Sequence, residues 1–151
     1  MAYRASYLVH AAEARDQLDW NPEWSRRARG FATYAALRQL GRSGVTGLVE
    51  QCCAHARRLV EGIGALPGAE VLWRPQVNVG MVSFQDDRRT EDVMARVLER
   101  GEAFFAGTTW RGRRAMRVSV FSWRTTERDV ERAIAAVAEA LAATVPATSV
   151  P

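Results

Sequence analysis

Ser25 and the two arginines after it have the residue types and position of an anion site. Asn21 is a good helix N-cap and Pro22 suits the first helical position, so the sequence predicts a helix from there to about Leu40. Backbone N–H groups and the dipole near a helix N-terminus favour an anion such as phosphate. A serine near a helix N-terminus is more often a plain cap or a solvated residue.

All 21 basic residues of the chain are arginine, and no lysine occurs. A guanidinium stays protonated and forms no Schiff base at ordinary pH, so chemistry that needs a lysine amine is closed to this polypeptide by itself. The net charge of +4 could indicate nucleic acid. The arginines are interleaved with acidic residues along the whole chain, so we interpret them as a solvated surface and expect no nucleic-acid partner.

The other reactive side chains form no recognisable site. Two isolated histidines and the adjacent Cys52 and Cys53 lack the spacing of a metal site, and we expect no metal. Neighbours on a helix point to different sides, so we expect one core thiol, one partly exposed thiol and no disulfide framework. His55, off the apolar stripe of its helix, is predicted to lie on the surface.

Length and hydropathy indicate one globular domain. No run approaches the roughly 20 apolar residues of a membrane helix, and charged residues near the start exclude a signal peptide. We therefore expect a cytoplasmic protein with no membrane partner.

The helix predicted up to Leu40 is unusual because its apolar residues occupy two sides. One side carries Trp24, Ala28, Phe31 and Ala35, and the other Thr33, Leu37 and Leu40. A helix that is apolar on two sides must bury both. One side can pack on the domain that follows, and the other needs an outside partner.

The rest of the chain predicts an α+β two-layer sandwich. The patterns predict a helix over 45–66, strands over 69–73 and 77–84, a short helix capped by Thr90 and ended by Gly101, strands over 102–106 and 115–123 joined through a turn at Gly112, and a final helix opened by a capping box at 125–129. Met116, Val118 and Val120 alternate with residues of the other face, as in a half-buried antiparallel strand.

Two long blocks carry a family resemblance. NPEWSRRARGFATYAALRQLGRSGVTGLVEQCCAHARRL and GTTWRGRRAMRVSVFSWRTTERDVERAIAAV look like the C-terminal part of group II pyridoxal-phosphate-dependent decarboxylases, the aromatic amino acid, tyrosine and glutamate decarboxylases. The resemblance implies a type I pyridoxal-phosphate-dependent transferase fold, as in aspartate aminotransferase. Residues 1–20 would end the mobile catalytic loop, 21–66 would be connecting helices, 67–145 the small C-terminal α+β domain, and 146–151 a disordered tail.

The resemblance also implies a function and a missing part. The family uses pyridoxal 5'-phosphate held by a lysine in a large domain, which would lie upstream of Met1, and works on L-amino acids as a homodimer. Tyr7 matches the loop tyrosine that acts as proton donor, and Ser25 the residue that reaches the cofactor phosphate of the other subunit. Arg26 and Arg117 match family arginines that we interpret as structural.

Two hypotheses follow from the sequence. The first is a decarboxylase fragment that contributes Tyr7, Ser25 and dimer surface and is inactive alone. The alternative is a free-standing α+β module that binds a ligand, a partner or RNA without catalysis. The retained loop and WSRR segment favour the first.

Overall fold

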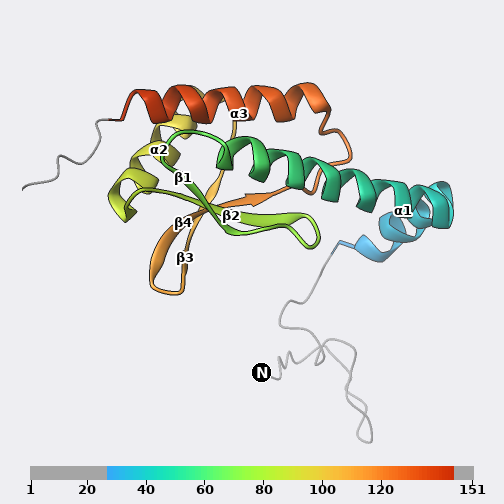
Figure 1. The fold of residues 1–151 in the computed structure, drawn as a ribbon. Helices are drawn as coiled ribbons and strands as arrows, with labels where there is room; N and C mark the ends of the chain where they lie inside the picture. Colours follow the sequence, from blue (N-terminus) through green and yellow to red (C-terminus); the bar gives the residue numbers. More distant parts are fainter. Residues whose placement is uncertain (1–26, 145–151) are drawn as a thin grey trace, which may run out of the picture. The chain divides into compact units, whose positions relative to one another are not determined.

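A computed structural model describes residues 27–144 of the 151-residue chain (Figure 1). Contacts divide the chain into two compact units, Met1–Gly41 and Arg42–Pro151. The elements are α1 (Arg29–Gly64), β1 (Ala69–Trp73), β2 (Val79–Phe84), α2 (Asp87–Arg100), β3 (Ala106–Trp110), β4 (Arg113–Ser119) and α3 (Glu127–Ala142).

Helix α1 is interrupted at one residue, Gly41, with φ 61° and ψ −174°. Glycine is the residue that adopts this conformation at least cost. The sequence predicts that the first helix ends at Gly41, and the structure confirms a break in the helix there. Helical structure resumes directly after it, whereas the prediction placed a second break at Gly44.

The predicted start of the first helix is wrong over its described part. Arg27 and Ala28 are not helical, and α1 begins at Arg29. The predicted cap, Asn21, lies outside the described residues. An earlier start would place Arg27 as well as Arg29 near the positive end of the helix dipole, which is unfavourable.

The four strands of the second unit form one antiparallel sheet in the order β1-β2-β4-β3. A two-residue turn joins β3 to β4, and both of its residues have positive φ, 49° at Arg111 and 80° at Gly112. Such turns match the twist of a hairpin, so the predicted turn at Gly112 is confirmed. Strand β1 has the predicted bounds. β2 begins two residues later than predicted, and β4 spans 113–119 rather than 115–123.

The strand predicted over 102–106 is wrong. After Gly101 ends α2 in the left-handed conformation, residues 102–105 form no strand, and β3 starts at Ala106. Glu102 bonds to Arg132 of α3, and Phe104 is exposed. Apolar residues alone therefore misled the prediction, because strand pairing with β4 begins only at Ala106.

Helix α2 has a different cap from the one predicted. The side chain of Asp86 accepts a hydrogen bond of 2.8 Å from the backbone N–H of Arg89. Thr90, predicted to be the cap, is instead fully buried inside the helix. Its hydroxyl accepts from the N–H of Phe84 at 2.9 Å and donates to the carbonyl of Asp86 at 2.9 Å. Asp86 is the N-cap because its carboxylate is a good acceptor for the backbone N–H groups at a helix start, whereas Thr90 is buried in the core.

Helix α3 opens with the predicted capping box, which is confirmed. Thr126 accepts from the N–H of Asp129, and the carboxylate of Asp129 accepts from the N–H of Thr126 at 2.9 Å. This reciprocal pair satisfies two backbone donors at the helix N-terminus.

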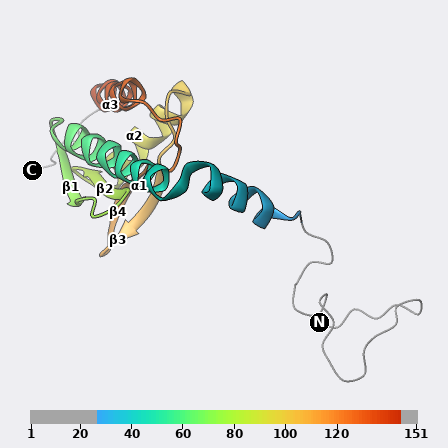
Figure 2. The ribbon, with the colours of Figure 1, turned by 90° about the vertical axis from the view of Figure 1, so that its right-hand side faces the viewer.

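In the second unit, the helices lie on one side of the sheet and the core fills the space between them (Figures 1 and 2). The residues predicted to point inward are buried: Met116 and Val118 of β4, and Val120 just after it. At Gly80, a Cβ would lie 2.6 Å from Val60 Cγ2, so glycine allows α1 to approach β2. The second unit is thus the α+β two-layer arrangement that the sequence predicts. Between residues 27 and 144, no helix combines the length and hydropathy needed to cross a membrane.

Candidate functional site

The two residues predicted to do chemistry, Tyr7 and Ser25, lie outside the described residues, as does Arg26. Their roles stay predictions. Arg117 is described: it lies exposed on β4, with Met81 of β2 and Ala106 of β3 as its neighbours in the sheet.

The second unit contains a concave surface of about 330 Å³ that we call the apolar hollow. It is lined by Leu48, Val49, Cys52 and Cys53 of α1 and by Val77, Asn78, Val120 and Phe121, which lie just outside β2 and β4. Two hydrogen bonds join Asn78 and Val120 in this lining. The backbone N–H of Val120 donates to the carbonyl of Asn78 at 3.1 Å, and the side-chain amide of Asn78 donates to the carbonyl of Val120 at 2.8 Å.

Sequence reasoning missed this hollow. The sequence does contain one signal for it, the large apolar residues Val77 and Phe121. The sequence patterns assign both residues to strands. In the structure Val77 precedes β2 and Phe121 follows β4, and both line the hollow together with residues of α1.

Both cysteines line the hollow, and this corrects the prediction of one core and one partly exposed thiol. Cys52 is 6% exposed and Cys53 9%, and both are free thiols. Adjacent helical residues point in different directions. Burial of both cysteines therefore requires other residues to cover more than one side of α1 at this point. The residues around Val77 and Val120 supply part of that cover.

His55 is also buried, at 7% exposed, and the prediction of a surface histidine is wrong. Its Nε2 lies 3.4 Å from the amide nitrogen of Gln51, which also donates to the carbonyl of Thr125 at 3.2 Å. The segment after β4 therefore passes close to α1, an arrangement that helical periodicity alone does not reveal.

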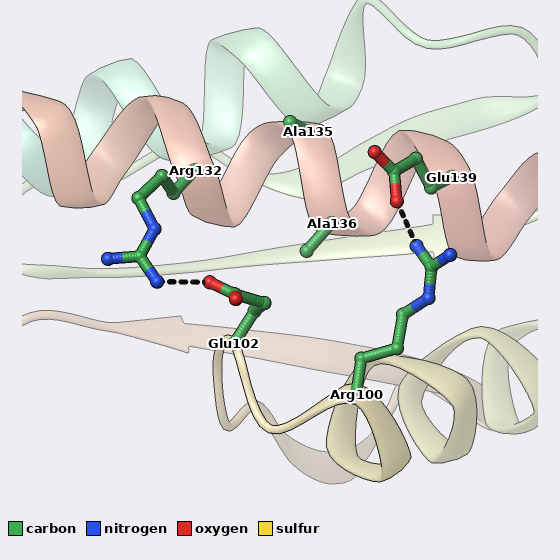
Figure 3. Close-up of a pocket in the computed structure, with 6 residues that line it drawn as sticks. All are labelled: Arg100, Glu102, Arg132, Ala135, Ala136 and Glu139. Atoms are coloured by element: carbon green, nitrogen blue, oxygen red, sulfur yellow. Dashed lines mark hydrogen bonds and ion pairs between the residues drawn. The ribbon is translucent and has the colours of Figure 1, made fainter.

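A second concave surface, the ion-paired groove, lies between α2 and α3 and has a volume of about 400 Å³ (Figure 3). Arg132 pairs with Glu102 at 2.5 Å, and Arg100 pairs with Glu139. Figure 3 shows Ala136 between the two pairs. Each cation of the groove already has a carboxylate partner. Since exposed ion pairs contribute little free energy, we interpret them as a solvated surface.

The sheet face opposite the helices carries a third group of side chains. Trp73 and Trp110, from the two edge strands, have ring centroids 5.6 Å apart at 61°. Arg113 donates to both carboxylate oxygens of Glu70, at 3.0 and 2.7 Å, and to Ser83 Oγ at 3.2 Å. The hydrogen bond from Arg113 lowers the pKa of Glu70, and the same bond raises the pKa of Arg113.

Within the part of the chain that the structure describes, no three His, Cys, Asp or Glu side chains gather as a metal site would require.

Comparison with known proteins gives a fold. No family model matches the chain, and no curated protein matches its sequence. The structure is similar to Rhodiola rosea 4-hydroxyphenylacetaldehyde synthase, with a TM-score of 0.75, 24% identity and 90% of this chain covered. It is similar to Catharanthus roseus tryptophan decarboxylase in complex with L-tryptophan, with a TM-score of 0.72, 16% identity and 82% covered. It is also similar to Oryza sativa TDC with PLP and tryptamine, with a TM-score of 0.73, 20% identity and 86% of this chain covered.

These matches span a small share of the known structures. The chain covers 31% of the Rhodiola protein, 28% of the Catharanthus protein and 30% of the Oryza protein. The described chain thus shares the fold of less than a third of each of these longer chains.

The described residues alone do not fit pyridoxal phosphate. The sequence has no lysine that could hold the cofactor covalently. A site that holds the cofactor through a lysine would need that lysine from another polypeptide segment.

Proposed function

We propose that this chain is the C-terminal part of a pyridoxal-phosphate-dependent L-amino-acid decarboxylase and that it is inactive alone. The likeness of its fold to tryptophan decarboxylase carries the proposal. It is supported by the long blocks of sequence resemblance and by the small share of each similar structure that the chain covers. The remaining share would supply the large domain that binds the cofactor.

The first part of α1 supports this proposal independently. Phe31, Tyr34, Leu37 and Leu40 are between 43% and 79% exposed. A short helix with so much exposed apolar surface gains little from folding by itself. We propose that the large domain, or the second subunit of a homodimer, covers it in the complete enzyme.

The proposed roles of this chain's residues concern binding and proton transfer. Bound pyridoxal phosphate supplies an electron sink for the loss of carbon dioxide. Tyr7 would hold a proton at its phenol oxygen and deliver it to the substrate carbon. The Ser25 hydroxyl would donate a hydrogen bond to the cofactor phosphate of the other subunit. The amino-acid pocket would lie mostly in the large domain.

The first test is to translate the DNA upstream of Met1 and to produce the complete protein that it encodes. The proposal expects a His-Lys pair upstream, a visible absorption band with pyridoxal phosphate, and release of carbon dioxide from an L-amino acid. The isolated chain should show neither the band nor carbon dioxide release. Either signal from the isolated chain would contradict the fragment hypothesis.

Two matched pairs of variants then test the residues in the complete protein. Tyr7→Phe should lower the rate of amine formation about 10²- to 10⁴-fold, the usual contribution of a positioned proton donor, and Tyr3→Phe should leave it unchanged. Ser25→Ala should raise the dissociation constant of the cofactor, measured by its absorbance, whereas Ser43→Ala should not. Equal effects within a pair would contradict the assigned role.

One observation favours the alternative, an RNA-binding module. The guanidinium of Arg111 lies 5.5 Å from the ring centre of Trp110, on a sheet whose open face also carries Trp73 and the exposed Arg117. Aromatic and arginine side chains on a sheet are suited to single-stranded nucleic acid. Binding of a single-stranded RNA that weakens steeply with salt would support this alternative. No quenching of tryptophan fluorescence by RNA at low salt would exclude it.

A further inference from the structure

The two concave surfaces of the second unit differ in how complete they are. In the ion-paired groove, Arg100 and Arg132 each have a carboxylate partner. In the apolar hollow, three large apolar residues of the lining are exposed: Val49 at 53%, Val77 at 58% and Phe121 at 73%. The first surface is suited to water, and the second leaves apolar area uncovered.

We propose that the apolar hollow is the docking site on this unit for the pyridoxal-phosphate-binding part of the same enzyme, which inserts a large aliphatic or aromatic side chain into it. This inference rests on the proposed function. The volume of about 330 Å³ is many times the roughly 30 Å³ of a water molecule, so it accommodates a large side chain.

The lining of the hollow fits a protein surface better than a metabolite. No charged residue lines it, and its one amide side chain, Asn78, already donates to the carbonyl of Val120. A small-molecule site needs several placed polar groups to orient its ligand. Depletion of charge at the centre and an aromatic residue such as Phe121 are instead typical of a protein–protein interface.

The identity of the occupant follows from chain length. The similar Rhodiola protein is a chain of which this one covers only 31%. If this chain belongs to such an enzyme, more than two thirds of the polypeptide must attach to it, and stable attachment needs a large interface. The hollow is an uncovered apolar concavity of the second unit, within residues 42–144.

The two cysteines provide the measurement. Cys52 and Cys53 line the hollow with 6% and 9% of their surface exposed, so a small reagent such as methyl methanethiosulfonate should modify them slowly in the isolated chain and more slowly still when a side chain fills the hollow. Mass spectrometry after timed exposure gives the rate. We expect modification at least tenfold slower in the complete protein than in the isolated chain.

A matched pair of variants of the complete protein tests the position. Phe121 and Phe104 are both 73% exposed, but only Phe121 lines the hollow. Phe121→Asp should return the modification rate to within about twofold of the isolated chain and lower the thermal midpoint, and Phe104→Asp should change neither. Circular dichroism of both variants in the isolated chain verifies that the second unit still folds.

The outcomes separate the two proposals. A complete protein that binds pyridoxal phosphate and releases carbon dioxide, with Phe121→Asp behaving like Phe104→Asp, overturns the docking site alone. Protection of the cysteines in a complete protein that neither binds the cofactor nor releases carbon dioxide overturns the proposed function and the identity of the occupant. Protection that rises with the concentration of the isolated chain would mean that a second copy fills the hollow, which also overturns the inference.

Discussion

The two halves of α1 have the same secondary structure and opposite surroundings. Every residue from Arg29 to Leu40 is exposed, whereas the half after Gly41 contains seven buried residues. These are Cys52, Cys53, His55, Ala56, Leu59, Val60 and Ile63. Helical conformation alone therefore does not indicate which half contributes to the stability of the described chain.

The difference teaches how to find a partner surface in a helix. Burial of an apolar face supplies most of the stability of a helix in a protein. The second half obtains that burial from the sheet and α3. The first half carries Phe31 and Leu37 on its surface, and no residue that the structure describes covers them.

The largest expected effect comes from a pair of phenylalanine truncations. Phe84 is fully buried and Phe31 is 79% exposed. Phe84→Ala should lower the free energy of unfolding by about 3–5 kcal/mol, because it leaves a cavity in the core. Phe31→Ala should change it by no more than about 0.5 kcal/mol. Urea unfolding of the isolated chain measures both, and a comparable loss for Phe31→Ala would show that the first half is covered after all.

A pair of glycine substitutions should give the next largest effect. A Cβ at Gly80 would lie 2.6 Å from Val60 Cγ2, whereas a Cβ at Gly47 would meet nothing within 4 Å. Gly80→Ala should lower the free energy of unfolding by about 1–3 kcal/mol through overpacking. Gly47→Ala should raise it by up to about 1 kcal/mol, because alanine is the better helix former. The same urea titration compares them, and a loss at both positions would contradict the packing argument.

The capping box of α3 gives a smaller, pH-dependent effect. The hydrogen bond from the Thr126 hydroxyl, and then that from its N–H, lower the pKa of Asp129 below 3.8. A group with a lowered folded-state pKa stabilises the protein above its unfolded-state pKa, and this contribution is lost as pH falls through the folded-state value. Asp129→Asn should therefore reduce the thermal midpoint at pH 7 and have progressively less effect below pH 4. A difference that stays constant down to pH 2 would exclude this linkage.

The smallest expected effect is that of deleting residues 1–41. The hydrophobic core lies entirely in the second unit. The urea midpoint for unfolding of the shortened chain should therefore equal that of the intact chain within error. Far-ultraviolet circular dichroism should lose only the helical signal of the deleted segment. A clear drop in the midpoint would mean that the first unit stabilises the second.

Local signals in the sequence predicted those elements whose residues all favour one structure. Three examples are the capping box at Thr126, the helix end at Gly101 and the turn at Gly112, and the structure has all three. In each, the residue type suits the backbone conformation or the hydrogen bond that the position requires. The alternation of Met116 and Val118 likewise placed one face of β4 in the core. These features depend on neighbours within a few positions in the chain.

The features that the sequence did not predict depend on distant segments. His55 is buried at a point where Gln51 bonds to Thr125, 74 positions away. Thr90 is buried because its hydroxyl satisfies the N–H of Phe84 in β2. The apolar hollow requires α1, Val77 and Phe121 to meet. Helical and strand periodicity contain no information about which loop crosses which helix.

The tryptophan pair has an optical consequence. β1 and β3 are the two outermost strands of the sheet, yet the rings of Trp73 and Trp110 are 5.6 Å apart. Electronic transitions of indoles this close couple and produce a paired positive and negative circular dichroism band. Because both inner strands must be in place before the rings can meet, that band would report assembly of all four strands from a single spectrum, without any added label.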